Sequence, residues 1–138
     1  MNSTTRPSQI KSDYWVDAAN PNPPNDWTDR SGKWLLFVPL KQLDEKWAII
    51  ARETESGQLG IAAKAATAKL NDLSKNQWVK VICVYTYDST DQQDVMRTRE
   101  RLRALGFSKK LSYKTDQATS EGRYRTSGDS TRISLYYE

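Results

Sequence analysis

Four cationic residues lie at or near the ends of segments that the sequence predicts to be β-strands. They are Lys33, Lys64, Lys114 and Arg125. Ammonium and guanidinium groups are the usual protein partners of phosphate oxygens. We therefore expect these four side chains to share one side of a β-sheet and to bind an anion there. The alternative is that each is a solvated charge at a strand end, which is the commoner situation for any single surface lysine.

Aromatic residues near the same strand ends are candidates to stack on a base or a sugar. Tyr85 and Tyr113 lie close to the ends of predicted strands, and Arg52 lies on the polar face of a predicted helix. Aromatic rings combined with cations form the usual surfaces that bind single-stranded nucleic acids. We therefore include Tyr85, Tyr113 and Arg52 in the candidate ligand-binding set.

The five tryptophans divide into two groups. Trp34, Trp47 and Trp78 lie on apolar stripes of predicted regular elements, so we expect them in the hydrophobic core. Trp15 and Trp27 lie in a polar segment, and we expect their rings to tether that segment to the rest of the molecule.

The chain has no histidine and a single cysteine, Cys83. This excludes Ser–His and Cys–His nucleophile systems, histidine-ligated metals and a histidine general acid. We expect no cofactor and no metal. Because Cys83 lies in the middle of a predicted strand, we expect it to be a small buried apolar residue in a reducing compartment.

The net charge of +4 is concentrated in the last third of the chain, where residues 97–138 hold ten basic and five acidic side chains. Such a basic region favours a polyanionic or phosphorylated partner, although solubility alone would also explain it. No apolar stretch approaches the length of about twenty residues that crosses a membrane, and the N-terminus has no apolar core of a signal peptide. We expect a cytoplasmic monomer that does not bind membranes.

The 138 residues fit one domain, preceded by a tail. Residues 1–30 are rich in Asn and Pro and predict a partly tethered tail without regular structure, and residues 31–138 predict a single domain. Segments 33–40, 58–64, 77–87 and 110–116 are predicted strands, 42–57 and 89–106 are predicted helices, and 122–138 is a predicted hairpin. This order predicts an α+β fold: a curved, mostly antiparallel sheet with two main helices packed on one face.

The two predicted helices have clear apolar stripes. The first stripe is Leu43, Trp47, Ile50 and Thr54, with Gly57 as the stop signal, and the second is Val95, Thr98, Leu102 and Leu105. Ser89 and Gln92 have the spacing of a capping box. The arginines at positions 97, 99, 101 and 103 flank the second stripe, so their stems are expected to cover apolar edges while their charged heads stay in water.

Five separated stretches carry a resemblance to a known family. They are SGKWL (31–35), LDEKWAIIAR (43–52), GQL (57–59), VICVYTYDSTD (81–91) and YKTD (113–116). Together they resemble the basophilic leukaemia expressed protein family. The resemblance implies a fold like that of the messenger-cap-binding translation initiation factor 4E. It also implies one of two activities: RNA binding, or a phosphothreonine lyase activity.

These observations predict a binding domain for a phosphate-bearing ligand, either RNA or a nucleotide. One alternative is a phosphothreonine-lyase-like enzyme acting on a phosphorylated peptide, in which Lys33, Lys64 or Lys114 would supply the base. The absence of histidine counts against that enzyme, because known lyases of this kind use a histidine as the acid. A further alternative is a scaffold whose sheet face meets another protein.

Overall fold

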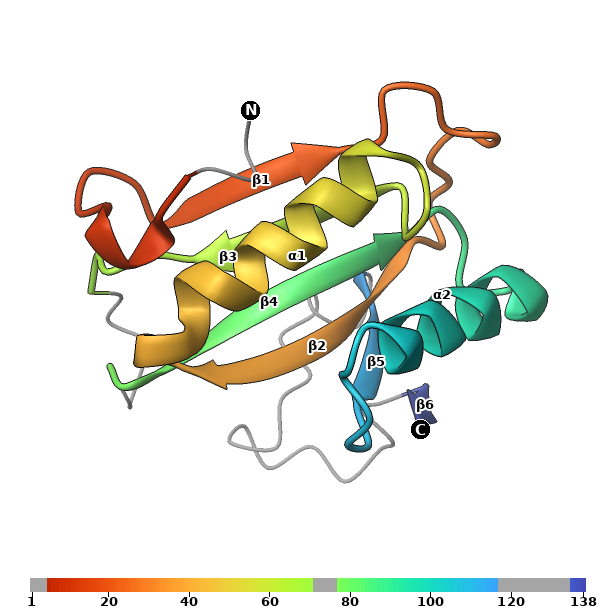
Figure 1. Cartoon of the computed structure of the whole chain (residues 1–138). Helices are drawn as coiled ribbons and strands as arrows, with labels where there is room; N and C mark the ends of the chain where they lie inside the picture. Colours follow the sequence, from red (N-terminus) through yellow and green to blue (C-terminus); the bar gives the residue numbers. More distant parts are fainter. Residues whose placement is uncertain (1–4, 71–76, 117–134) are drawn as a thin grey trace.

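A six-stranded antiparallel sheet, covered on one face by two helices, forms the molecule (Figure 1). The computed structural model describes residues 5–70, 77–116 and 135–138 of the 138-residue chain. The strands follow one another across the sheet in the order β1-β3-β4-β2-β5-β6. The predicted α+β class, with two helices on one face of a curved antiparallel sheet, is confirmed.

The strands are β1 (Trp15–Ala19), β2 (Gly32–Pro39), β3 (Ala62–Ala66), β4 (Val79–Thr86), β5 (Ser112–Thr115) and β6 (Tyr136–Tyr137). The helices are α1 (Leu43–Glu55) and α2 (Gln92–Ala104), with short 3₁₀ turns η2 (Pro7–Gln9) and η3 (Leu40–Gln42). No helix in the described part of the chain is both long and apolar enough to cross a membrane. Most of the predicted hairpin 122–138 lies outside the described residues.

β1 is a strand that the sequence did not predict. Its five residues lie in the polar segment before residue 31, and they pair with β3 from Trp15 opposite Ala66 to Ala19 opposite Ala62. Val16 and Ala18 pack toward the core, whereas their neighbours do not. This short segment is a strand because it pairs with β3. Its own composition does not favour a strand, so the sequence alone did not predict it.

The hydrophobic core lies between the sheet and the helices. Trp47 and Ile50 of α1 and Leu102 of α2 form one buried cluster with Trp34 of β2 and Ile82 of β4. The indole N–H of Trp34 donates to the carbonyl of Val95 on α2, at 3.1 Å. The predicted stripe of α1 is fully buried: Leu43, Trp47, Ile50 and Thr54.

The predicted ends of the two helices are right in one case and wrong in the other. Gly57 follows α1 with a φ of +81°, and its N–H donates to the carbonyl of Thr54, as expected of a helix stop. The capping box of Ser89 and Gln92 is wrong, because the N-cap of α2 is Asp91, whose carboxylate accepts from the N–H of Asp94 at 3.1 Å. The preceding residues turn around Asp88, so the helix starts later than its composition indicated.

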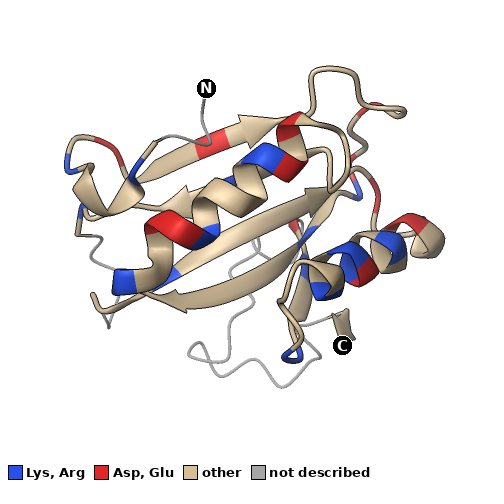
Figure 2. Ribbon diagram, viewed as in Figure 1, with Lys and Arg blue, Asp and Glu red and all other residues tan. Residues whose placement is uncertain are grey.

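Basic residues recur along α2 (Figure 2). One of them, Arg99, contradicts the expectation that the α2 arginines keep their heads in water. Its side chain is completely buried. The guanidinium donates to the carbonyls of Phe107 at 2.9 Å, Lys109 at 2.8 Å and Glu138 at 2.7 Å. Arg99 therefore ties α2 to the two chain segments beyond it, whereas Arg103 pairs with Glu100 at the surface.

Trp78 is the second exception. We expected it in the core, but its side chain is 65% exposed. It lies just before β4 and beside the start of α1, where it lines a surface hollow with Leu40 and Asp44. Trp78 precedes β4 and lies beyond the region where helix and sheet pack, so its apolar ring is not part of the buried face of the strand.

We expect Arg99→Ala to lower the free energy of unfolding by about 2 kcal/mol, because three carbonyls lose their donor and a buried stem leaves a void. The matched control Arg103→Ala, on the same helix, should change it by less than about 0.5 kcal/mol. Urea unfolding followed by circular dichroism measures both values. Equal losses for the two variants would show that Arg99 is not an anchor.

Candidate functional site

The sheet face opposite the helices carries the three predicted lysines that the structure describes. They are Lys33 on β2, Lys64 on β3 and Lys114 on β5. Each is followed or preceded by a core residue, namely Trp34, Ala63 and Tyr113. Because side chains alternate along a strand, the lysines point to the other side. We call the surface made by Trp15, Lys33, Lys64, Cys83, Tyr85 and Lys114 the lysine face.

Strand register brings these residues together. Lys33 lies directly opposite Lys114 on one neighbouring strand and opposite Tyr85 on the other. Lys64 lies opposite Cys83, which is on the same face as Tyr85 and two residues before it. Lys33 and Lys114 are therefore direct neighbours, and Lys64 lies on the far side of β4 from Lys33.

Tyr85 lies at the centre of the lysine face. The ammonium of Lys33 lies 5.7 Å from its ring centroid and that of Lys64 lies 5.9 Å from the same centroid. Lys64 also lies over the ring of Trp15, at 4.1 Å. Trp27, from the segment between β1 and β2, packs edge-on against Tyr85 with centroids 5.7 Å apart. Two cations and three aromatic rings thus meet within one small area.

Two carboxylates moderate the charge of this face. Asp116 accepts a hydrogen bond from the ammonium of Lys33 at 2.8 Å and another from the hydroxyl of Ser31. Asp17 on β1 lies opposite Lys64. Three ammonium groups stand against two carboxylates, so the face remains positive. Lys33 is only 7% exposed, and its pairing with Asp116 satisfies a charge that would otherwise be costly to bury.

Cys83 shows which of two opposing effects is stronger on this face. The ammonium groups of Lys64, Lys33 and Lys114 favour its thiolate and act to lower its pKa. Burial acts in the opposite direction and prevails, raising the pKa of Cys83 from its ordinary 9.0 to about 11. Cys83 is 3% exposed, which agrees with the expectation of a small buried residue.

The remaining candidates from the sequence lie elsewhere. Arg52 is exposed on α1, the helix that covers the opposite face of the sheet. Tyr113 is fully buried on the core side, where its hydroxyl shares a hydrogen bond with Thr86 and burial raises its pKa. Arg125 lies outside the described residues. The structure therefore brings together Lys33, Lys64, Lys114 and Tyr85, and separates Arg52 and Tyr113 from them.

Sequence reasoning left Trp15 and Trp27 out of the candidate site, although both rings contact it. Trp15 is 39% exposed and Trp27 is 49% exposed. The available signal was two large aromatic residues within an otherwise polar, Asn- and Pro-rich segment. Nothing in that segment indicated which part of the sheet the two rings would meet.

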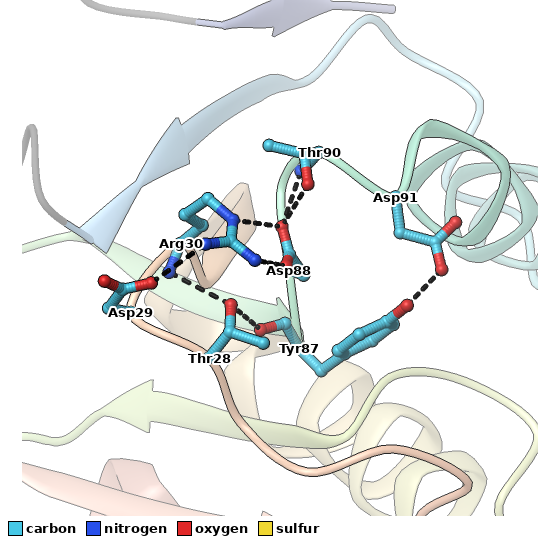
Figure 3. A network of polar contacts seen from close by, with 7 residues as sticks. All are labelled: Thr28, Asp29, Arg30, Tyr87, Asp88, Thr90 and Asp91. Atoms are coloured by element: carbon cyan, nitrogen blue, oxygen red, sulfur yellow. Dashed lines mark hydrogen bonds and ion pairs between the residues drawn. The ribbon is translucent and has the colours of Figure 1, made fainter.

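A polar network joins the segment before β2 to the turn after β4 (Figure 3). The carboxylate of Asp88 accepts from the hydroxyl of Thr90 at 2.6 Å, from its N–H at 2.8 Å, and from the guanidinium of Arg30 at 2.8 Å. The hydroxyl of Tyr87 donates to Asp91. These hydrogen bonds, first that of Thr90 and then that of Arg30, hold the pKa of Asp88 well below its usual range.

The described residues contain no group of three or more acidic or cysteine side chains placed to hold a metal ion. The model of the basophilic leukemia-expressed protein Bles03 family matches residues 25–120, more than half of the chain. The chain belongs to this family. The family match confirms the resemblance read from the five separated stretches. The range that matches the Bles03 model includes Trp27, Lys33, Lys64, Tyr85 and Lys114, and Trp15 precedes it.

We expect Cys83 to react with a thiol reagent far more slowly in the folded protein than in the unfolded chain. A thiol with a pKa of about 11 carries roughly a hundredfold less thiolate at pH 8 than one with its ordinary value, and burial slows access further. Because Cys83 is the only cysteine, labelling with and without urea measures this directly. Similar rates in both conditions would contradict the burial of the Cys83 side chain.

Proposed function

We propose that the lysine face binds a nucleotide, either free or as a unit of single-stranded RNA. The observation that carries the proposal is the position of Lys64, whose ammonium lies within 6 Å of the rings of both Trp15 and Tyr85. A nucleotide presents a flat base beside a charged phosphate. Aromatic rings interleaved with ammonium groups match both parts, by stacking and by ion pairing.

A nucleotide fits this face better than a simple inorganic anion does. An anion alone would use the ammonium groups and leave the rings of Trp15, Tyr85 and Trp27 without a purpose at the surface. Trp15 and Trp27 both contact residues of the lysine face and are 39% and 49% exposed, so part of each apolar ring can meet a base. The family resemblance implies a fold like that of the cap-binding initiation factor, and this implied likeness adds support, by fold analogy, for a nucleotide ligand.

The phosphothreonine lyase activity implied by the resemblance has less support. Elimination needs an uncharged amine to take the α-proton and an acid to protonate the departing phosphate. The ammonium of Lys33 is held in an ion pair with the carboxylate of Asp116 at 2.8 Å, and the chain has no histidine to serve as the acid. The same pairing suits a residue that holds a phosphate by its charge.

We expect binding of a fluorescent single-stranded RNA to weaken on the order of tenfold between about 50 and 200 mM salt, because two or three lysines displace counterions from the phosphates. Lys64→Ala should weaken binding a further fivefold to tenfold, since one charge-assisted contact is lost. Fluorescence anisotropy measures both effects.

The matched control is Lys46→Ala, which removes one positive charge from α1 on the opposite side of the sheet and should leave the affinity within about twofold. Equal losses for Lys64→Ala and Lys46→Ala would indicate a non-specific attraction to overall charge and would overturn the proposal. Release of phosphate from a phosphothreonine peptide, lost in Lys64→Ala, would favour the lyase instead.

A further inference from the structure

We infer that Trp27 contacts the base of the bound nucleotide and gives the site a preference for purines. Asp88 positions Trp27 by holding segment 27–31 against the end of β4. This inference rests on the nucleotide site proposed above and deepens it, since it assigns the base-dependent part of recognition to a residue outside the sheet. Its support comes from the path of the chain, the anchors of the segment and the position of the Trp27 ring.

The path of the chain brings Trp27 to the lysine face. β1 and β2 are consecutive in sequence, but β3 and β4 lie between them in the sheet. The connecting segment 20–31 must therefore pass the ends of both intervening strands (Figure 1). It passes Tyr85, near the end of β4, which is the central ring of the lysine face.

The last part of this segment is firmly anchored. The backbone N–H of Thr28 donates to the carbonyl of Tyr87 at 3.1 Å, and the hydroxyl of Thr28 donates to the same carbonyl at 3.2 Å. The N–H of Ser89 donates to the carbonyl of Arg30 at 2.6 Å. Residues 21–26, just before the anchors, are all exposed. Trp27 therefore stands at the boundary between an exposed stretch and a fixed one.

Asp88 lies between Tyr87 and Ser89, the two residues that hold this segment through the backbone, and adds a side-chain contact to Arg30. It is 5% exposed, and its carboxylate both orders its own turn through Thr90 and accepts from two nitrogens of the Arg30 guanidinium, at 2.8 and 3.4 Å (Figure 3). Two hydrogen bonds from one planar group fix orientation as well as distance. Asp88 is therefore a positioning residue: it does not lie on the lysine face but sets where Trp27 meets Tyr85.

The ring of Trp27 remains available to a ligand. It meets Tyr85 edge-on, at an angle of 67° between ring planes, and it is 49% exposed. An edge contact fixes the ring without covering it as a stacked contact would. Purines have a larger ring system than pyrimidines, and stacking strength sets the modest base preferences of such surfaces. Recognition by Trp27 thus favours a purine.

Two tryptophan variants and two kinds of ligand test the inference. Wild-type protein should bind a short oligoadenylate more tightly than an oligouridylate of equal length, by about threefold or more. Trp27→Ala should weaken oligoadenylate binding by about tenfold and abolish the preference, while affinity for tripolyphosphate, which has no base, stays unchanged. The control Trp78→Ala removes another exposed tryptophan at a distant site and should preserve both affinities.

An aspartate pair tests the clamp. Asp88→Asn should lose the purine preference as Trp27→Ala does, because a neutral amide cannot hold the Arg30 guanidinium by charge. Asp29→Asn removes the other carboxylate that pairs with Arg30, but that side chain is 90% exposed, so the preference should persist. Thermal unfolding checks that each variant is folded. If Asp88→Asn is unfolded, Trp27→Ala alone decides.

The outcomes separate this inference from the proposed function. A wild-type preference that survives Trp27→Ala, or equal affinity of the wild type for both oligonucleotides, overturns the role of Trp27 and leaves the lysine face as a nucleotide site. A wild-type protein that binds neither oligonucleotide at low salt overturns the proposed function, and the inference with it. Loss of tripolyphosphate binding in Trp27→Ala would show that Trp27 supports the whole face rather than the base.

Discussion

The pairing of β2 with both β4 and β5 positions the centre of the candidate site. Through this register Lys33 faces Tyr85 on one side and Lys114 on the other. A slip of one residue would turn Lys33 into the core and Trp34 out to solvent, since successive side chains alternate. The fully buried Trp34, which hydrogen-bonds to α2, makes that slip costly. The core on one face thus fixes the arrangement of charges on the other.

Burial and charge oppose each other on the lysine face, and Cys83 and Lys33 show the two outcomes. Lys33 is almost fully buried, and its ammonium forms an ion pair with the carboxylate of Asp116. The thiol of Cys83 is surrounded by ammonium groups, yet burial raises its pKa and leaves it protonated at neutral pH. Cys83 therefore does not have the protonation state of a nucleophile. A fixed charge beside aromatic rings is suited to recognition.

The arrangement of the strands explains why part of the site comes from outside the sheet. Consecutive strands that are not neighbours need a connection across the strands between them, and here that connection carries Trp27 past the end of β4. The ion pair of Asp88 and Arg30 holds the connection in place more firmly than an exposed pair would, because Asp88 is buried and orders its turn as well. A polar segment thereby gains a defined position without a core of its own.

Local patterns in the sequence determined the fold class and the buried stripe of α1. Periods of 2 and 3.6 residues are properties of a segment itself, so they can be read without the rest of the chain. Only the tertiary structure decided four other features: the pairing of β1, the burial of Arg99, the core position of Tyr113 and the contact of Trp27 with Tyr85. Each depends on partners distant in sequence, such as β3 for β1 and the carbonyls beyond α2 for Arg99. A segment's own residues do not encode the identity of such partners, and this is the physical reason that sequence reasoning missed them.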